Sequence, residues 1–151
     1  MKFIQNIFII LAAAFLTAGC TRNNGDIGDL FGDWRLVALT ADGEELELYE
    51  GDARLYTWAF QSSIIRIQEI RAYMDYSDYL GTWKRVDDEL ILDFTHHADY
   101  GDDNFTPPEV LHLVAHGITR LEIIRLDSGK LQAGYKGDNG VEYMYFLNKV
   151  P

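Results

Sequence analysis

The chain opens with a hydrophobic segment and then changes to short runs in which apolar and polar residues alternate. Alternation with a period of two is typical of strands that bury one face, because successive side chains point to opposite sides of a strand. Turn sequences such as Asp-Gly and Asp-Ser-Gly separate the runs. The pattern predicts strands over residues 33–40, 44–49, 54–61, 64–71, 79–86, 89–95, 118–126, 130–136 and 141–148. Strands at this close spacing indicate an antiparallel β-sandwich or β-barrel.

One segment departs from the alternation. Residues 96–106 are polar and acidic, and a pair of prolines then leads into apolar residues at helical spacing. Proline suits the first turn of a helix, and the glycine at position 117 suits its end. We therefore expect a short helix over residues 107–116, within a loop over 97–117 that covers one end of a barrel.

The hydrophobic segment at the start has the features of an export signal. Its ten apolar residues, 7–16, follow Lys2 and precede Cys20, the only cysteine. Ten residues make about 15 Å of helix, half the thickness of a bilayer core, so the segment predicts a signal peptide rather than a membrane span. Residues 16–20 (LTAGC) resemble the lipobox of bacterial lipoproteins. This resemblance implies removal of residues 1–19 and acylation of Cys20; the alternatives are a secreted protein with a free thiol and a buried structural cysteine.

Composition divides the rest of the chain and narrows its partners. A polar, glycine-containing stretch predicts a flexible tether over residues 20–29, and a single domain follows over 30–151. The formal net charge is −11 and no stretch is rich in Lys or Arg, which excludes binding to nucleic-acid backbones. The acyl anchor would make the membrane a partner and place the protein in the cell envelope. The lipobox resemblance also implies the outer membrane, because Thr21 stands where some lipoproteins carry a retention Asp, and the domain would face the periplasm or the cell surface.

Two Gly-x-Trp motifs open predicted strands, Gly32 with Trp34 and Gly81 with Trp83. Together with residues 145–149 (YFLNK) near the end of the chain, they resemble the lipocalin-like (calycin-type) lipoproteins of Bacteroidetes over residues 30–150. The resemblance implies an all-β, antiparallel, up-and-down barrel of eight to nine strands, here with one short helix, that can hold a small apolar ligand. It also implies that Lys149 packs across Trp34. The alternative is that both tryptophans serve packing alone.

Aromatic residues gather on single faces of two predicted strands. Tyr56, Trp58 and Phe60 alternate along one strand, and Tyr143 and Tyr145 alternate along the last. If these faces point inward, they either fill the barrel or line an aromatic pocket. We predict that these five residues line the site of a small apolar or aromatic ligand. The alternative is a filled barrel that acts as a protein-interaction or inhibitor module of an envelope complex.

Motifs for catalysis are absent from the sequence or incomplete. His112 and His116 are four residues apart on the expected helix, and His96 and His97 precede it, a set that zinc could accept. Leu113 stands where the metalloprotease pattern His-Glu-x-x-His requires its glutamate. Packing between helix and barrel is the alternative role of these histidines, and they are weak metal candidates. No serine-hydrolase, phosphate-loop or dinucleotide motif occurs, so we expect a non-enzymatic protein without a cofactor.

Overall fold

The computed structural model describes residues 28–49, 51–95 and 105–151. In these three ranges the chain forms β-strands and two single turns of 3-10 helix, and no α-helix. The strands are β1 (Gly32–Ala41), β2 (Glu44–Glu45), β3 (Ala53–Gln61), β4 (Ile64–Arg71), β5 (Tyr76–Val86), β6 (Glu89–Asp93), β7 (Ile118–Leu126), β8 (Lys130–Lys136) and β9 (Glu142–Lys149). The 3-10 turns are η1 (Ala72–Met74) and η2 (Glu109–Leu111).

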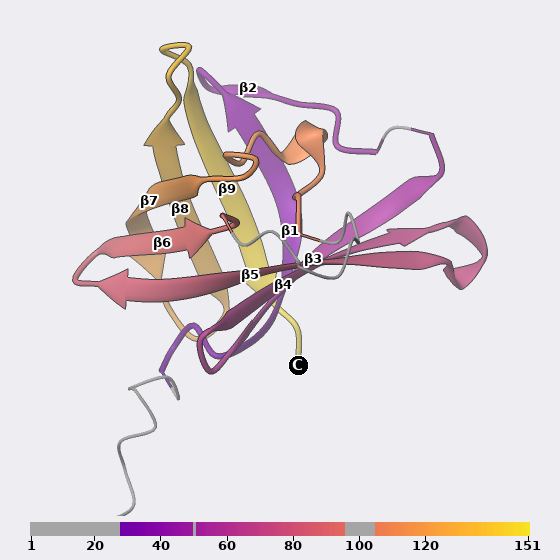
Figure 1. Cartoon of the computed structure of the whole chain (residues 1–151), viewed down its shortest axis with the longest axis horizontal. Helices are drawn as coiled ribbons and strands as arrows, with labels where there is room; N and C mark the ends of the chain where they lie inside the picture. Colours follow the sequence, from indigo (N-terminus) through magenta and orange to yellow (C-terminus); the bar gives the residue numbers. More distant parts are fainter. Residues whose placement is uncertain (1–27, 50, 96–104) are drawn as a thin grey trace, which may run out of the picture.

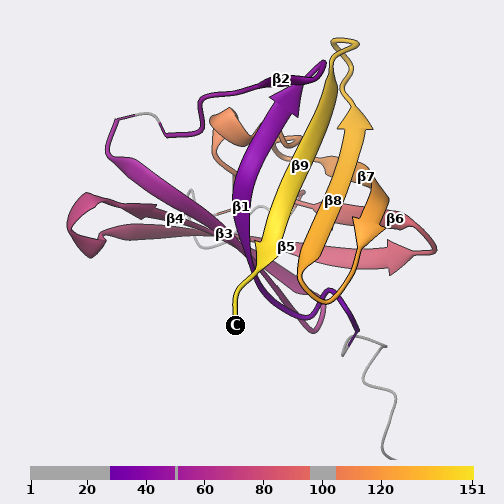
Figure 2. The same ribbon diagram turned by 180° about the vertical axis from the view of Figure 1, so that it is seen from behind.

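The strands form one antiparallel sheet that closes on itself (Figure 1, Figure 2). From β3 to β9 each strand pairs with the next in chain order, and β9 pairs back onto β1, from Trp34 opposite Lys149 to Ala41 opposite Tyr143. Eight strands close the barrel, while β2 pairs with the end of β1 and lies outside. The pairing of β9 with β1 distinguishes a barrel from a sandwich. The predicted up-and-down barrel is therefore confirmed.

The predicted strands agree closely with β3, β4, β7 and β8, whose bounds differ by one residue at most. The turn between β1 and β2 has Asp42 and Gly43 at φ values of 50° and 85°, the left-handed geometry that Asp-Gly favours. The strand expected over 44–49 is much shorter. After Glu45 only the Leu46 amide still donates to β1, at Leu39 O (2.9 Å), and the chain then leaves the sheet.

The interior of the barrel forms the hydrophobic core. Along β7, for example, buried Thr119, Leu121 and Ile123 alternate with exposed residues. All eight barrel strands contribute side chains to one buried cluster. The largest fully buried side chains are Trp34, Trp58, Tyr145, Phe60 and Phe94. Large aromatic side chains thus fill the middle of the barrel.

The helix predicted over residues 107–116 is wrong, since this segment holds only the single turn η2. The turn ends at His112, whose backbone is left-handed (φ 50°), and His116 also has a positive φ of 54°. Leu111 and Leu113 are both buried, 0% and 8% exposed. An α-helix would place residues two apart on nearly opposite sides. Burial of both leucines in the barrel therefore outweighs the local helical pattern.

The first strand has different neighbours along its length. Gly32–Arg35 pair with β3, whereas pairing with β9 continues up to Ala41. Beyond Arg35, β3 diverges from β1, and the β3–β4–β5 part of the sheet extends away from the rest of the barrel (Figure 1). Residues 105–117, which we call the lid, carry η2 and bring Leu111 and Leu113 into the core cluster.

Candidate functional site

The barrel has two ends. The closed end carries the start of β1 and the short turns at residues 62–63, 87–88 and 127–129. The open end carries the lid and the turns at residues 42–43 and 137–141. This division follows from the antiparallel order, because successive connections lie at alternate ends of the sheet.

The closed end is sealed around Trp34, which is fully buried. Its indole N–H donates to Leu30 O (2.7 Å), and the Lys149 Nζ lies 5.1 Å from the centroid of its ring. The same ammonium donates to Asp29 O (3.0 Å). Gly32 has φ 113°, a backbone conformation open to glycine, and a side chain there would approach Lys149. The contact between Lys149 and Trp34 is the one that the family resemblance implies.

The five predicted ligand-lining residues all lie on the inner face of the barrel. Trp58 and Tyr145, from β3 and β9, have ring centroids 5.4 Å apart, and Phe60 packs edge-on against Trp83 at 5.1 Å. Each of the five has an exposed fraction of 6% or less. The structure therefore brings them together as packed core in the middle of the barrel, with Tyr143 nearest the open end. Their contact with a ligand stays a prediction.

Hydrogen bonds from two tyrosines, the buried Tyr145 and the half-buried Tyr135, hold the lid. The Tyr145 phenol donates to Leu111 O (2.8 Å), and the Tyr135 phenol donates to His112 O. Burial, with the neighbouring phenols as smaller causes, raises the pKa of Tyr145 well above its usual value. The phenol therefore stays protonated as a donor at neutral pH. The lid is attached to the barrel at the two residues that end η2.

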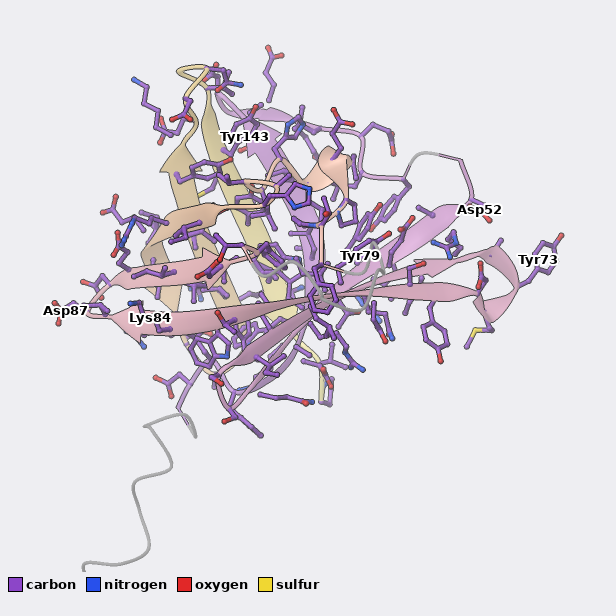
Figure 3. All side chains as sticks on the ribbon, viewed as in Figure 1. Asp52, Tyr73, Tyr79, Lys84, Asp87 and Tyr143 are labelled. Carbon is purple, nitrogen blue, oxygen red and sulfur yellow. The ribbon has the colours of Figure 1, made fainter. Side chains whose placement is uncertain are left out.

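A hollow of about 550 Å³, which we call the lid pocket, lies between the lid and the β8–β9 hairpin. Small-molecule sites have volumes of roughly 300–1,000 Å³. Three aromatic rings stack along its wall: His112 lies 4.8 Å from Tyr143, and Tyr135 lies 5.6 Å from Tyr143. Asn139 donates to the Tyr143 phenol (3.0 Å). Figure 3 places Tyr143 toward the end of β9 at which the lid lies. The pocket thus combines ring faces with polar groups.

Two of the three stacked rings were not in the predicted set. Tyr135 pairs directly with Tyr143 and follows the buried Ala133 by two positions, so alternation along β8 was a usable signal. His112 had no such signal. Its ring reaches Tyr143 because the backbone turns left-handed at the end of η2.

The charges at the two ends are arranged differently. At the closed end Arg66 pairs with Asp33 (3.9 Å) and Arg125 with Asp127 (2.7 Å). At the open end, acidic side chains predominate. The described acidic side chains of the open end that take part in no ion pair are Asp42, Glu44, Glu45, Glu47, Glu109, Asp138 and Glu142. The rim of the open end therefore carries uncompensated negative charge.

A second polar cluster lies on β4 and β5. The Tyr79 phenol donates to Glu69 Oε2 (2.9 Å), and Arg71 pairs with Glu69 (3.3 Å) and donates to Ser77 Oγ (2.9 Å). Burial and the Glu69 carboxylate raise the pKa of Tyr79. Figure 3 shows Tyr79 near the middle of the molecule and Tyr73 at the far tip of the hairpin. Because these groups satisfy one another, the cluster stabilises the extended hairpin.

A larger hollow of about 900 Å³ lies along the β5–β6 hairpin, β7 and β8. Exposed residues of β7, such as Ile118 and Arg120, line it, so it lies against the outer wall of the barrel. The Arg120–Glu89 ion pair (3.0 Å) joins two of its lining residues. In contrast to the lid pocket, the lining of this groove includes one aromatic residue, Tyr135. We therefore take the lid pocket as the candidate site.

The two candidate metal ligands that the structure describes, His112 and His116, make separate contacts. His96 and His97 lie outside the described residues. His112 stacks on Tyr143, whereas His116 Nε2 lies 3.3 Å from Thr106 Oγ1, and the shared helical face expected for the two histidines does not exist. Among residues that the structure describes, no three His, Cys, Asp or Glu side chains are grouped to hold a metal ion.

The predicted signal peptide, Cys20 and most of the tether also lie outside the described residues. Within the described ranges, no helix has the length and hydrophobicity needed to cross a bilayer. The acylation of Cys20 stays a prediction.

Comparison with known proteins agrees with the observed barrel. The family model described as Lipocalin-like domain matches residues 14–134. A lipocalin-like protein from Bacteroides uniformis is 17% identical, with a TM-score of 0.60 over 82% of this chain and 100% of that chain. An uncharacterized protein from Bacteroides eggerthii is 14% identical, with a TM-score of 0.56 over 80% of this chain and 99% of that chain. A search of the curated proteins gives no match.

At these identities the structural likeness shows the fold, and the family match covers most of the chain. The predicted resemblance is therefore confirmed. The chain belongs to the lipocalin-like domain family, whose members are typically non-enzymatic binding proteins.

Proposed function

We propose that the protein is a lipid-anchored envelope lipoprotein that binds a small apolar or aromatic molecule at the open end of its barrel. The lid pocket is the observation that carries the binding role. Its volume of about 550 Å³, its stacked rings and its position under a lid suit a flat molecule of modest size. In this proposal Tyr143 contacts the ligand directly.

The other four predicted residues lie in the barrel core and are not part of the lining of the lid pocket. Leu111 lies above Tyr145, joined to it by the phenol hydrogen bond, and Tyr145 packs against Trp58. Displacement of Leu111 would open a path from the lid pocket toward these two rings. Tyr56 and Phe60 lie on the same inner face of β3 as Trp58, with Phe60 toward the closed end, where it is paired with Gly32. The lid thus controls how deeply a ligand enters.

Titration with the neutral fluorescent probe N-phenyl-1-naphthylamine tests this role. We expect saturable binding with a rise in probe fluorescence, because the probe moves from water to an apolar site. His112→Ala should weaken the binding by removing one exposed ring of the pocket wall. His116→Ala is the matched control, since His116 lies on the same lid but does not line the pocket. Absence of saturable binding, or equal effects of both variants, would contradict the proposal.

The anchoring part of the proposal rests on residues 16–20 and the apolar run before them. Growth of the native organism with an alkyne-labelled fatty acid should label the protein, and Cys20→Ser should abolish the label. We expect the labelled protein in the outer-membrane fraction, with the barrel facing the periplasm or the cell surface. Recovery of protein that retains residues 1–19 would contradict processing at Cys20.

One observation favours a second candidate, a protein-interaction module. The tip of the β4–β5 hairpin exposes Tyr73, Met74 and Tyr76 by 102%, 83% and 60%. Large apolar side chains exposed together are typical of partner surfaces. A photoreactive residue at position 73 should then cross-link a defined protein in intact cells, whereas the same residue at position 124, an exposed site on β7, should not. Equal labelling at both positions would contradict this role.

A further inference from the structure

We infer that the lid pocket selects a protonated amine carried on a flat ring. The inference rests on the proposed ligand binding and adds the chemical class of the ligand. It depends on the ring faces, the charges and the hydrogen-bonding groups that line the pocket.

The rings supply the first element of the site. Tyr143 stacks with His112 at an interplanar angle of 15° and with Tyr135 at 28°. His112 is exposed on the lid, so its ring presents a free surface against which a flat ligand can stack. The face of a tyrosine ring is electrically negative and attracts a nearby cation. The wall therefore suits an aromatic ligand and favours one of positive charge.

The carboxylates supply the second element. Glu109 from the lid and Asp138 from the β8–β9 turn both line the pocket, and no Lys or Arg is among its described lining residues. Within the part of the chain that the structure describes, neither carboxylate forms an ion pair or a side-chain hydrogen bond. Lys136 and Asp138 both line the outer groove, and of these two residues only Asp138 also lines the lid pocket. The pocket therefore has negative charge and lacks a counter-ion of its own.

The neighbouring groups extend this charge. The Asp138 carboxylate acts on Tyr135, whose pKa is raised by burial first and then by Tyr143 and Asp138. Glu47 lies across η2, in a second hollow of about 500 Å³ that it shares with Glu109 and His112. His112 therefore shares a hollow with Glu109 and Asp138 and a second hollow with Glu47 and Glu109. An ammonium group can donate to these carboxylates, whereas a carboxylate ligand would be repelled.

A matched set of naphthalene compounds tests the inference: 1-naphthylmethylamine, 1-naphthylmethanol and the anion of 1-naphthylacetic acid. Each is titrated by calorimetry at pH 7 and low salt. The three share one ring and differ in charge. We expect the amine to bind about tenfold more tightly than the alcohol, and the acetate most weakly. Added salt should reduce this preference by screening the exposed carboxylates.

Two variants test which carboxylates cause the preference for the amine. Glu109→Gln and Asp138→Asn should each weaken amine binding by about threefold or more and reduce alcohol binding by less, since the charge is removed and the shape is kept. Glu122→Gln is the matched control, because Glu122 is an exposed carboxylate in the outer groove. Binding of the alcohol without a preference for the amine would overturn the inference and leave the proposed function standing. Failure of all three compounds to bind would overturn both.

Discussion

At the closed end, Trp34 is hydrogen-bonded to Leu30 and covered by Lys149, whereas at the open end the exposed ring of His112 stacks on Tyr143 beside a hollow. Both ends use aromatic rings and charged side chains. At the closed end the cation and the backbone acceptors satisfy one another. At the open end, ring faces and carboxylates remain available. We therefore expect the closed end to contribute mainly to the stability of the barrel and the open end mainly to ligand binding.

The largest effect expected from this comparison is at Trp34. Trp34→Ala removes a fully buried side chain and leaves a cavity, so it should lower the free energy of unfolding by about 3–5 kcal/mol. Urea unfolding measures the change. His112→Ala at the open end is the comparison, and it should cost less than about 1 kcal/mol because the ring is exposed. Similar losses in the two variants would break the distinction between the ends.

The lid should depend on the hydrogen bond from Tyr145. Tyr145→Phe leaves Leu111 O without its donor and should lower the free energy of unfolding by about 1–3 kcal/mol. Hydrogen exchange at the Val114 amide, which donates to Thr119 Oγ1 (2.8 Å), should become faster, because the lid is held less firmly. An unchanged exchange rate would show that this hydrogen bond does not hold the lid.

The raised pKa of Tyr145 predicts that the free energy of unfolding depends on pH. Burial raises the folded-state pKa of Tyr145 above the value of about 10 in the unfolded chain. Its contribution is fully present below about pH 10 and is lost as the pH rises toward the folded-state pKa, because the unfolded chain releases the proton first. Unfolding measured from pH 8 to 11 should show this loss, and Tyr145→Phe should reduce its slope. An identical slope in both proteins would assign the loss to other groups.

A smaller effect is expected from two turns, η1 at the tip of the β4–β5 hairpin and the turn between β1 and β2. Tyr73 and Met74 have φ values of 62° and 63°, a conformation costly for side chains with a Cβ, whereas Asp42 and Gly43 suit it. The double change Tyr73→Asn and Met74→Gly should raise the free energy of unfolding by about 1 kcal/mol. The reverse change, Asp42→Tyr with Gly43→Met, should lower it. A loss of stability in the first variant would mean that the exposed tip contributes contacts.

The smallest effect is expected on the outer wall. Arg120 and Glu89 form an ion pair whose side chains are 57% and 41% exposed. Arg120→Ala should change the free energy of unfolding by less than about 0.5 kcal/mol, since exposed pairs are screened by water and salt. Chemical unfolding at low and high salt checks this. A loss above 1 kcal/mol would show that the outer groove shares in stability.

Much of the barrel could be predicted from the sequence because alternation records which face of a strand is buried. The bounds of β4, β7 and β8 and the Asp42–Gly43 turn follow from local patterns alone. The lid does not. Its apolar spacing favours a helix, but the barrel interior accepts Leu111 and Leu113 together, and this contact with the core decides the conformation.

The candidate site was predictable only in part for a similar reason. Tyr143 was found from its strand, and Tyr135 could have been found from the facing strand. Glu109, His112 and Asp138 come from two loops that approach each other only after β8 and β9 are in place. No spacing along the chain encodes that approach, because it depends on closure of the sheet and on the left-handed residue at the end of η2.

The short pairing between β1 and β3 has a mechanical consequence. Trp34, Arg35 and the two residues before them are the part of β1 that is paired with β3, while β9 holds β1 along most of its length. Separation of β3 from β1 beyond Thr57 would therefore break none of the pairing between β1 and β9. A wider opening at the lid end of the barrel, large enough for a ligand, would then leave the β1–β9 pairing in place. The buried Trp34 would keep its position at the closed end.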